Sequence, residues 1–306
     1  MKKTSTLLRE YLKSGEPLLI PGVYDALSAR IAEMLGFKVV IHTGYGTAAS
    51  KFGLPDIGLV SFGEMVERVK EICRAISIPV IGDADTGYGN AVNVYRTVKE
   101  YIYAGAAGLF IEDQVWPKRC GHMFGKQIIS MEEMIGKVMA AVDARNEVDP
   151  DFVIGARTDA IAVTGFEDAI ERARAYVKAG ADFIFIEAYE NIDQMKEAVK
   201  ELKGVPLMLN LIEGGRTPLV TFKEAADLGF KLIIFPLTAL YSAAKAIHDN
   251  LKILKETGDP RNYLDKIMAF KDFAQVVNIK KFEELEKRYI PEKILKEKYR
   301  GEVRMV

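Results

Sequence analysis

The sequence predicts a (β/α)8 barrel, because eight short apolar segments of strand length alternate with segments of helical periodicity. The pairs fill about 240 residues, which is the usual size of this fold. Several apolar segments are continuous, as is typical of parallel strands buried on both faces. A doubly wound sheet is the alternative, but that fold does not require eight units.

The first half of the chain contains four strand–helix pairs after a short amphipathic helix over 5–14. The predicted strands cover 17–20, 38–42, 79–82 and 108–111. The predicted helices cover 25–35, 62–76 and 92–104, and a fourth runs from the N-cap Ser130 to Arg145. Ser130 and Glu133 have the spacing of a capping box.

The second half of the chain repeats the pattern and completes the barrel. The predicted strands cover 152–156, 183–186, 206–209 and 232–235, and the predicted helices cover 166–179, 192–202, 221–228 and 238–255. We therefore expect a catalytic barrel domain over 1–258 and a helical extension over 259–306. The extension carries apolar residues such as Leu264, Met268 and Phe282. Because the barrel is already complete, these residues need another surface, either a neighbouring subunit or their own barrel.

Composition limits the possible partners and compartments. Half of the residues are hydrophobic, which allows a sizeable core. The formal net charge is −1 and no basic cluster stands out, so nucleic acid and anionic membranes are poor candidate partners. Only two cysteines are present, and the N-terminus carries charges where a signal peptide needs its apolar region. No apolar run approaches the roughly 20 residues that span a bilayer, so we expect a cytoplasmic protein.

Polar residues stand where the predicted strands end. In a barrel these carboxyl ends converge on one pocket, the usual active-site face. The residues at these ends are Thr43 and Gly44, Asp83 and Asp85, Glu112, Arg157, Glu187 and Asn210.

Asp83, Asp85 and Glu112 form an all-oxygen set that favours a hard cation. Mg²⁺ suits a few carboxylates with retained waters, and Mn²⁺ is an acceptable substitute. Arg157 beside them indicates a carboxylate or phosphate ligand. The alternatives are that the acids cap helices or pair with Arg157, and that Arg157 pairs with Glu187 or Asp159.

A thiol with cationic neighbours follows the fourth strand. Cys120 lies between Lys118, Arg119 and His122 in a segment bounded by Pro117 and Gly121. Nearby positive charge lowers the pKa of a thiol and makes proton donation near neutral pH easier. The alternative is an exposed basic loop with an incidental cysteine.

These residues resemble the isocitrate lyase and phosphoenolpyruvate mutase superfamily over nearly the whole chain. The motifs that carry the resemblance are Leu54-Pro55-Asp56, Asp83-Ala84-Asp85-Thr86-Gly87-Tyr88-Gly89, Gly105-Ala106-Ala107-Gly108, Ile111-Glu112-Asp113-Gln114, Lys118-Arg119-Cys120-Gly121-His122, Ala156-Arg157-Thr158-Asp159 and Glu213-Gly214-Gly215-Arg216-Thr217-Pro218. The cysteine motif is similar to that of the branch with methylisocitrate lyase and 2,3-dimethylmalate lyase. It argues against a carboxyphosphonoenolpyruvate phosphonomutase, a label that many relatives carry.

The resemblance implies a Mg²⁺-dependent retro-Claisen cleavage of a 2-hydroxy acid. Cys120 is then the proton donor under a closing loop, in a catalytic set with Asp56, Lys118, Arg119 and His122. Asp83, Asp85 and Glu112 are the implied metal ligands. The implied substrate-binding residues are Thr43, Gly44, Tyr45, Arg157, Glu187, Asn210 and Arg216. The family also implies a homotetramer whose last helix is swapped between subunits.

The residues after Asn210 bear on the choice of substrate. Leu211 and Ile212 follow it where tricarboxylate lyases carry small hydroxyl residues, and burying a charged carboxylate against isoleucine is costly. Tyr45 also replaces a glycine of methylisocitrate lyases. We therefore expect an alkylmalate such as 2,3-dimethylmalate, cleaved to pyruvate and propionate. The alternative is 2-methylisocitrate, cleaved to pyruvate and succinate, with Arg216 supplying the missing charge. Less favoured are a phosphonomutase and a non-catalytic binding protein.

Overall fold

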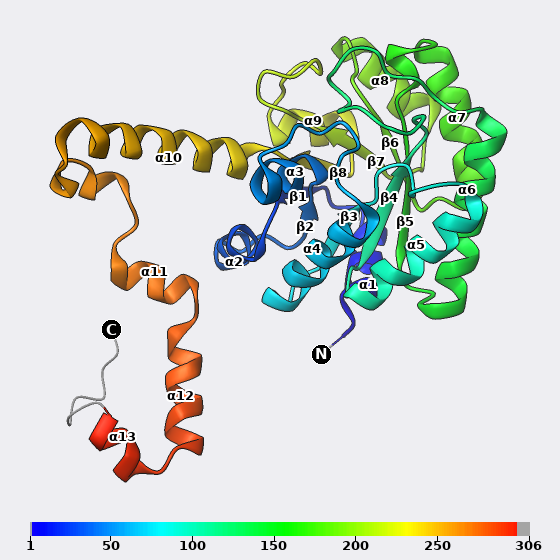
Figure 1. The fold of residues 1–306 in the computed structure, drawn as a ribbon. Coiled ribbons are helices and arrows are strands. Elements are labelled where there is room, and N and C mark those ends of the chain that lie inside the picture. The colour runs from blue at the N-terminus through cyan, green and yellow to red at the C-terminus, as the bar shows by residue number, and fades with distance from the viewer. Residues whose placement is uncertain (1, 299–306) are drawn as a thin grey trace. The chain divides into compact units, whose positions relative to one another are not determined.

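The computed structural model describes residues 2–298 and confirms the predicted barrel. Eight parallel strands pair in chain order, and the first pairs with the last to close the barrel (Figure 1). The strands are β1 Leu18–Val23, β2 Val40–His42, β3 Val80–Asp83, β4 Gly108–Glu112, β5 Val153–Thr158, β6 Phe183–Ile186, β7 Leu207–Asn210 and β8 Leu232–Phe235.

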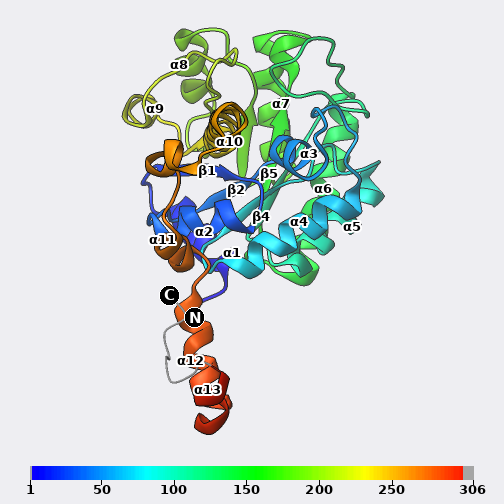
Figure 2. The same cartoon turned by 60° about the vertical axis from the view of Figure 1, so that its left-hand side comes forward.

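Helices surround the strands as an outer layer, and Figure 2 shows α4, α5 and α6 along one side of it. These helices are α1 Thr4–Lys13, α2 Ala26–Met34, α3 Gly44–Phe52, α4 Phe62–Ala75, α5 Ala91–Ala104, α6 Met131–Val148, α7 Phe166–Lys178, α8 Ile192–Glu201 and α9 Phe222–Leu228. A short 3-10 helix over Ala160–Ala162 follows β5. Helix α3 was not predicted. The expected capping box of α6 is only half formed, because Ser130 accepts from the Glu133 N–H without the reciprocal bond.

The strands bury both of their faces. One set of strand side chains, including Leu109, Ile154 and Ile184, packs outward against the helices. The other set, including Phe110 and Phe185, fills the inside of the barrel together with Leu8 of α1. The Leu8 side chain is fully buried among them and closes the amino-terminal end. The polar residues at the carboxyl ends of the strands are therefore the ones that face an accessible pocket.

A buried carboxylate ties the end of β5 to helix α7. Asp113, directly after β4, accepts hydrogen bonds from the Asp159 N–H at 3.0 Å and the Tyr176 hydroxyl at 2.8 Å. Arg172 Nη1 donates to the same carboxylate at 3.2 Å. The network fixes the backbone of Asp159, which follows the last residue of β5.

The chain divides into two compact units, the first ending at Tyr241 and the second beginning at Ser242. The division lies inside helix α10 Thr238–Thr257, earlier than the predicted start of the extension at residue 259. A 3-10 helix Pro260–Lys266 and helices α11 Phe270–Val276, α12 Ile279–Tyr289 and α13 Glu292–Lys298 follow. The second unit does not itself cover several large apolar side chains, among them Leu264, Met268, Phe270 and Phe282.

Candidate active site

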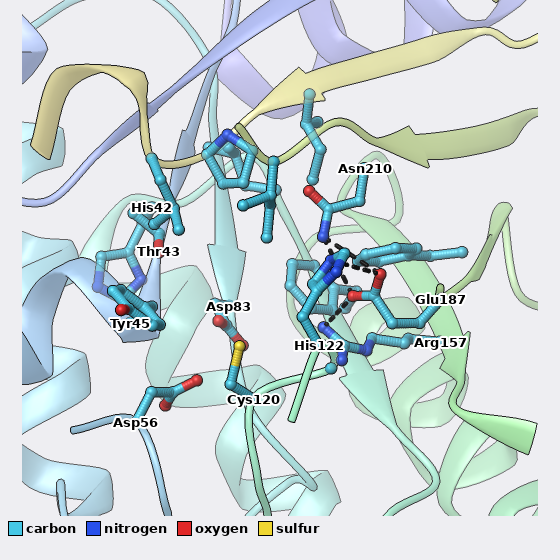
Figure 3. Close-up of a pocket in the computed structure, with 18 of the residues that line it drawn as sticks. His42, Thr43, Tyr45, Asp56, Asp83, Cys120, His122, Arg157, Glu187 and Asn210 are labelled. Carbon is cyan, nitrogen blue, oxygen red and sulfur yellow. Dashed lines mark hydrogen bonds and ion pairs between the residues drawn. The ribbon is translucent and has the colours of Figure 1, made fainter. Parts of the chain in front are cut away.

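A pocket opens at the carboxyl end of the barrel strands and collects most of the predicted site residues (Figure 3). Its volume with the open mouth is about 520 Å³, which is in the range of small-molecule sites. The predicted residues that line it are Thr43, Tyr45, Asp56, Asp83, Lys118, Cys120, His122, Arg157, Glu187 and Asn210. The structure thus brings together, in one pocket, ten residues that were predicted from separate parts of the chain.

The candidate metal ligands lie at the ends of β3 and β4. Asp83 accepts from the Gly44 N–H at 3.0 Å through Oδ2, which places the start of α3 against it. Asp85 has a φ of 47°, an unusual backbone conformation for a residue other than glycine. Glu112 Oε1, a buried oxygen of this set, has no hydrogen-bond donor. A buried carboxylate oxygen without a donor suits the requirements of a hard cation.

The Lys118 ammonium group lies among these acids. Its Nζ atom is 2.8 Å from Asp85 Oδ1 and 2.6 Å from Asp56 Oδ1. Burial raises the pKa of Asp85 to about 6, while the Lys118 charge opposes that rise. Among residues 2–298, no group of three His, Cys, Asp or Glu side chains is arranged to hold a metal ion as it stands. In this structure a lysine is the cation beside these carboxylates.

Arg157 at the end of β5 joins three carboxylates. Its Nε atom lies 2.9 Å from Asp159 Oδ2 and 3.3 Å from Glu112 Oε2, and Nη1 lies 3.1 Å from Glu187 Oε2. The predicted alternative, pairing with Asp159 and Glu187, is therefore observed, although the side chain also lines the pocket. Asn210 Nδ2 donates to Glu187 at 3.1 Å. Burial opposes the ionised form of Glu187, but the charge of Arg157 and a hydrogen bond from His122 outweigh it and lower its pKa to about 2.

The Cys120 loop, residues 115–127, carries the half-buried thiol into the pocket. The Cys120 N–H donates to the Asp56 carbonyl at 3.1 Å. The expected lowering of the thiol pKa is wrong. Burial and the nearby Asp56 carboxylate raise it to about 11, although Lys118 opposes the rise. A thiol with a raised pKa stays protonated at neutral pH, which suits a proton donor better than a nucleophile.

His122 bridges the Cys120 loop and the loop after β7. Its Nδ1 atom accepts from the Arg216 N–H at 2.8 Å, so a neutral ring carries its proton on Nε2. That nitrogen lies 3.4 Å from Glu187 Oε1. Gly215 permits this approach, because a Cβ atom there would lie 2.9 Å from the ring.

Several predicted residues do not line the pocket. Arg119 is exposed, and its backbone N–H donates to Gln114 Oε1 at 2.9 Å. The Arg216 guanidinium lies over the Phe124 ring, 4.4 Å from its centroid, so it brings no charge to the pocket in this structure. Gly44, Asp85 and Glu112 do not line it either.

The structure also places residues at the site that the sequence reasoning did not assign to it. His42 lines the pocket, and its Nε2 atom lies 2.9 Å from Thr47 Oγ1. Ile234, Pro236 and Leu237 join Ile212, which the sequence had already indicated, in an apolar wall. The buried Lys126, near the end of the Cys120 loop, donates a hydrogen bond to the carbonyl of Gly121 in the same loop. Pro236 and Leu237 could have been predicted from the sequence, because they follow β8 and barrel active sites use the residues that follow the strands.

Fold and site together define an enzyme class: a (β/α)8 barrel that gathers acidic, guanidinium and thiol groups in one pocket at the carboxyl ends of its strands. The family model described as phosphoenolpyruvate phosphomutase matches residues 8–255. The chain belongs to this family and is a lyase of the PEP mutase/isocitrate lyase superfamily.

Three relatives illustrate the range of names within the family. A 2,3-dimethylmalate lyase from Eubacterium barkeri is 46% identical over 94% of this chain and 98% of its own length. A chloroplastic carboxyvinyl-carboxyphosphonate phosphorylmutase from Arabidopsis thaliana is 49% identical over 89% and 80%. A 2-methylisocitrate lyase from Aeropyrum pernix is 40% identical over 92% and 90%.

Solved structures confirm the fold. A 2,3-dimethylmalate lyase in a trigonal crystal form matches with a TM-score of 0.89 and 38% identity, over 94% of this chain and 96% of that one. Oxaloacetate acetylhydrolase with 3,3-difluorooxalacetate matches equally well, over 94% and 98%. A phosphonopyruvate hydrolase in complex with oxalate and Mg²⁺ matches at 0.85 and 31%, over 95% and 100%.

Proposed function

We propose that the protein cleaves the C2–C3 bond of an alkylmalate such as 2,3-dimethylmalate and releases pyruvate and propionate. The observation that carries the proposal is the thiol of Cys120, which lines the same pocket as Arg157 and the candidate metal ligand Asp83. A proton donor, an anion-binding group and an acidic cation site are what a retro-Claisen cleavage requires. The similarity to a 2,3-dimethylmalate lyase supports the same reaction.

Mg²⁺ is the proposed cofactor, with Mn²⁺ as a substitute, and Asp83, Asp85 and Glu112 would hold it. The donor set fits, because it consists of carboxylate oxygens and the buried Glu112 Oε1 lacks a hydrogen-bond donor. A bound Mg²⁺ would supply Lewis-acid charge for the hydroxyl and carboxylate oxygens of the substrate. The phosphonopyruvate hydrolase crystallised with oxalate and Mg²⁺ supports this choice.

The protein's own groups account for the movement of protons and charge. The substrate hydroxyl loses its proton, the C2–C3 bond breaks, and C2 becomes the carbonyl carbon of pyruvate. The bond electrons remain on C3 of the departing propionate fragment. Cys120 Sγ then gives its proton to C3, and the proton lost by the hydroxyl restores the thiol. The Arg157 guanidinium binds the carboxylate beside C2 and stabilises charge as the carbonyl forms.

The apolar wall supports a dicarboxylate rather than a tricarboxylate. Ile212 is 8% exposed and lines the pocket, so it cannot donate a hydrogen bond to a third carboxylate. Tyr45 also lines the pocket, and its ring packs edge-on against Tyr241. Burial of an unpaired carboxylate against such a surface costs more than the roughly 2–7 kcal/mol that a neutral polar group without a hydrogen bond costs. A methyl substituent on C3 meets no such cost.

2-Methylisocitrate remains the second candidate, because five of the similar proteins carry the name 2-methylisocitrate lyase. For that substrate Arg216 would have to leave the Phe124 ring and turn toward the pocket. Comparison of the specificity constants for dimethylmalate, methylisocitrate and isocitrate, all by keto-acid release, separates the two candidates. A preference for methylisocitrate that Arg216→Ala abolishes would replace our choice.

Three further assays test the chemistry. Exhaustive chelation should abolish turnover, and Mg²⁺ should restore it. Cys120→Ser should lose most of the cleavage rate and still bind pyruvate with Mg²⁺, whereas the control Cys73→Ser should retain the rate. Wild-type cleavage by Cys120→Ser would refute the donor role. Phosphorus NMR with a phosphonate substrate tests the mutase activity named for the Arabidopsis relative.

We further propose that the protein is a homotetramer in which the second unit covers a neighbouring subunit. The support is the set of apolar side chains that this unit leaves uncovered by its own residues. Light scattering at micromolar concentration should give four times the mass of the chain. A fully active monomer would contradict this assembly.

A further inference from the structure

Lys126 is a buried lysine whose ammonium group lies between the Cys120 loop and the barrel. Its side chain is 1% exposed. The Nζ atom donates to the Gly121 carbonyl at 2.5 Å and to Asp159 Oδ1 at 2.7 Å. Asp159 also binds Arg157 through both of its oxygens, so one carboxylate joins this lysine to a pocket residue.

Backbone hydrogen bonds hold the Cys120 loop at its base and at the Cys120 N–H, which donates to the Asp56 carbonyl at 3.1 Å. Gln114 and Ile128 form an antiparallel bridge, and the Val115 N–H donates to the Gln127 carbonyl at 2.8 Å. Between these points the loop turns at Cys120, where the Met123 N–H donates to the Cys120 carbonyl at 2.8 Å. Lys126 lies near the base and reaches across the loop to Gly121, the residue between Cys120 and His122. It is therefore a direct link from the barrel to the turn that carries the thiol.

We propose that Lys126 is a positioning residue that latches the Cys120 loop closed over the pocket. Without its ammonium group, the Gly121 carbonyl loses a charge-assisted hydrogen bond to Lys126, and the loop loses its ion pair with Asp159 at the end of β5. The turn is then held less firmly over the pocket. A buried lysine that only balanced charge would need Asp159 alone, and Arg157 already pairs with that carboxylate. The bond to the Gly121 carbonyl assigns the latch role. The kinetic part of this inference rests on the proposed lyase function, whereas the structural part does not.

The rate at which a reagent alkylates Cys120 reports whether the loop is closed, and this test needs no assumption about the reaction. In a Cys73→Ser background, Cys120 is the one remaining cysteine. Alkylation by iodoacetamide at pH 8 should be at least tenfold faster in Lys126→Met than in the parent. Loss of a positive charge by itself raises the pKa of a nearby thiol and slows alkylation, so a faster rate reports an opened loop rather than altered electrostatics.

Control variants separate the latch from a general effect on stability. Lys203→Met changes an exposed lysine outside the site and should leave the alkylation rate unchanged. Lys126→Gln retains the stem and a shorter neutral donor, and it should also accelerate alkylation if Lys126→Met does not fold. Folded Lys126→Met or Lys126→Gln protein with the parent alkylation rate would overturn the latch.

Steady-state kinetics test whether the latch serves catalysis. For the substrate that the specificity comparison selects, Lys126→Met should lower kcat at least tenfold and change KM less than threefold, because Arg157 still binds the substrate. Faster alkylation with an unchanged kcat would overturn the positioning role. If the wild-type protein cleaves none of the three acids, the proposed function fails, and the alkylation result still decides the latch.

Discussion

The ammonium nitrogen of Lys118 lies 2.8 Å from Asp85 Oδ1, so a cation of the Cys120 loop neutralises a candidate metal ligand. Asp56 Oδ1 lies on its other side at 2.6 Å. A loop that covers the pocket thus competes with the ion for which that carboxylate is suited. The competition gives the proposed metal site a measurable property.

Lys118→Met should bind Mg²⁺ at least tenfold more tightly than the wild-type protein. A unit charge about 4 Å away opposes a cation by ~4 kcal/mol at an effective dielectric constant near 20. Because the lysine can swing aside, we expect only the order of 1.4 kcal/mol, or tenfold, to remain. Isothermal titration with Mg²⁺ measures the affinity, and Lys203→Met is the matched control. Equal affinities in Lys118→Met and wild type would show that Lys118 does not compete.

Alkylation of Cys120 should keep rising with pH far beyond the range of an ordinary thiol. Only the thiolate reacts, and burial raises its pKa to about 11 in the folded protein. The rate constant should therefore increase about tenfold per pH unit up to pH 10 in a Cys73→Ser background. The same chain in denaturant should level off near pH 9. A plateau near pH 8.5 in the folded protein would contradict the raised pKa.

Gly121→Ala should impair catalysis with little loss of stability. The added Cβ atom would lie 2.4 Å from Arg157 Nη2 and 2.5 Å from Glu187 Cγ, so the loop has to move outward. We expect kcat/KM to fall about 100-fold, or ~2.7 kcal/mol, while the melting temperature changes by only a few degrees. Gly63→Ala, which meets no atom within 4 Å in helix α4, is the control. Normal activity in Gly121→Ala would mean that the closed position is not required.

His42 should make the folded protein sensitive to mild acid. Burial lowers its pKa to about 4, whereas the unfolded value is about 6.5. Between these values the unfolded chain binds more protons, so stability falls as pH decreases. From pH 7 to pH 5 the wild-type protein should lose roughly 2 kcal/mol more than His42→Gln. Urea denaturation at one protein concentration measures both, and equal losses would refute the assignment.

The barrel and most of the pocket were predictable because they depend on periodicity. Each strand is a run of apolar residues, and the polar residue that ends it points to the carboxyl face whatever its partners are. Helix α3 escaped prediction because Thr43-Gly44-Tyr45-Gly46 reads as a turn, and glycine disfavours a helix by about 1 kcal/mol per residue. Its first N–H binds Asp83, a contact 39 residues away in sequence.

The Cys120 loop was less predictable because no periodicity governs side chains there. Lys118 turns inward, whereas the adjacent Arg119 is exposed, and sequence spacing does not distinguish them. The thiol pKa was predicted in the wrong direction because the sequence shows neighbouring charges but not burial. Nothing in the sequence indicated a role for Lys126, because its partners Gly121 and Asp159 come together only when the loop folds back on the end of β5.

Through the Asp113 network, the geometry of the pocket depends on a residue of the outer helix layer. Arg172 belongs to helix α7 and lines no part of the pocket, yet it shares Asp113 with the backbone of Asp159. A survey of random variants would therefore count Arg172 among the residues that activity requires. Loss of activity at such a position would reflect a displaced strand end rather than a lost contact with the substrate.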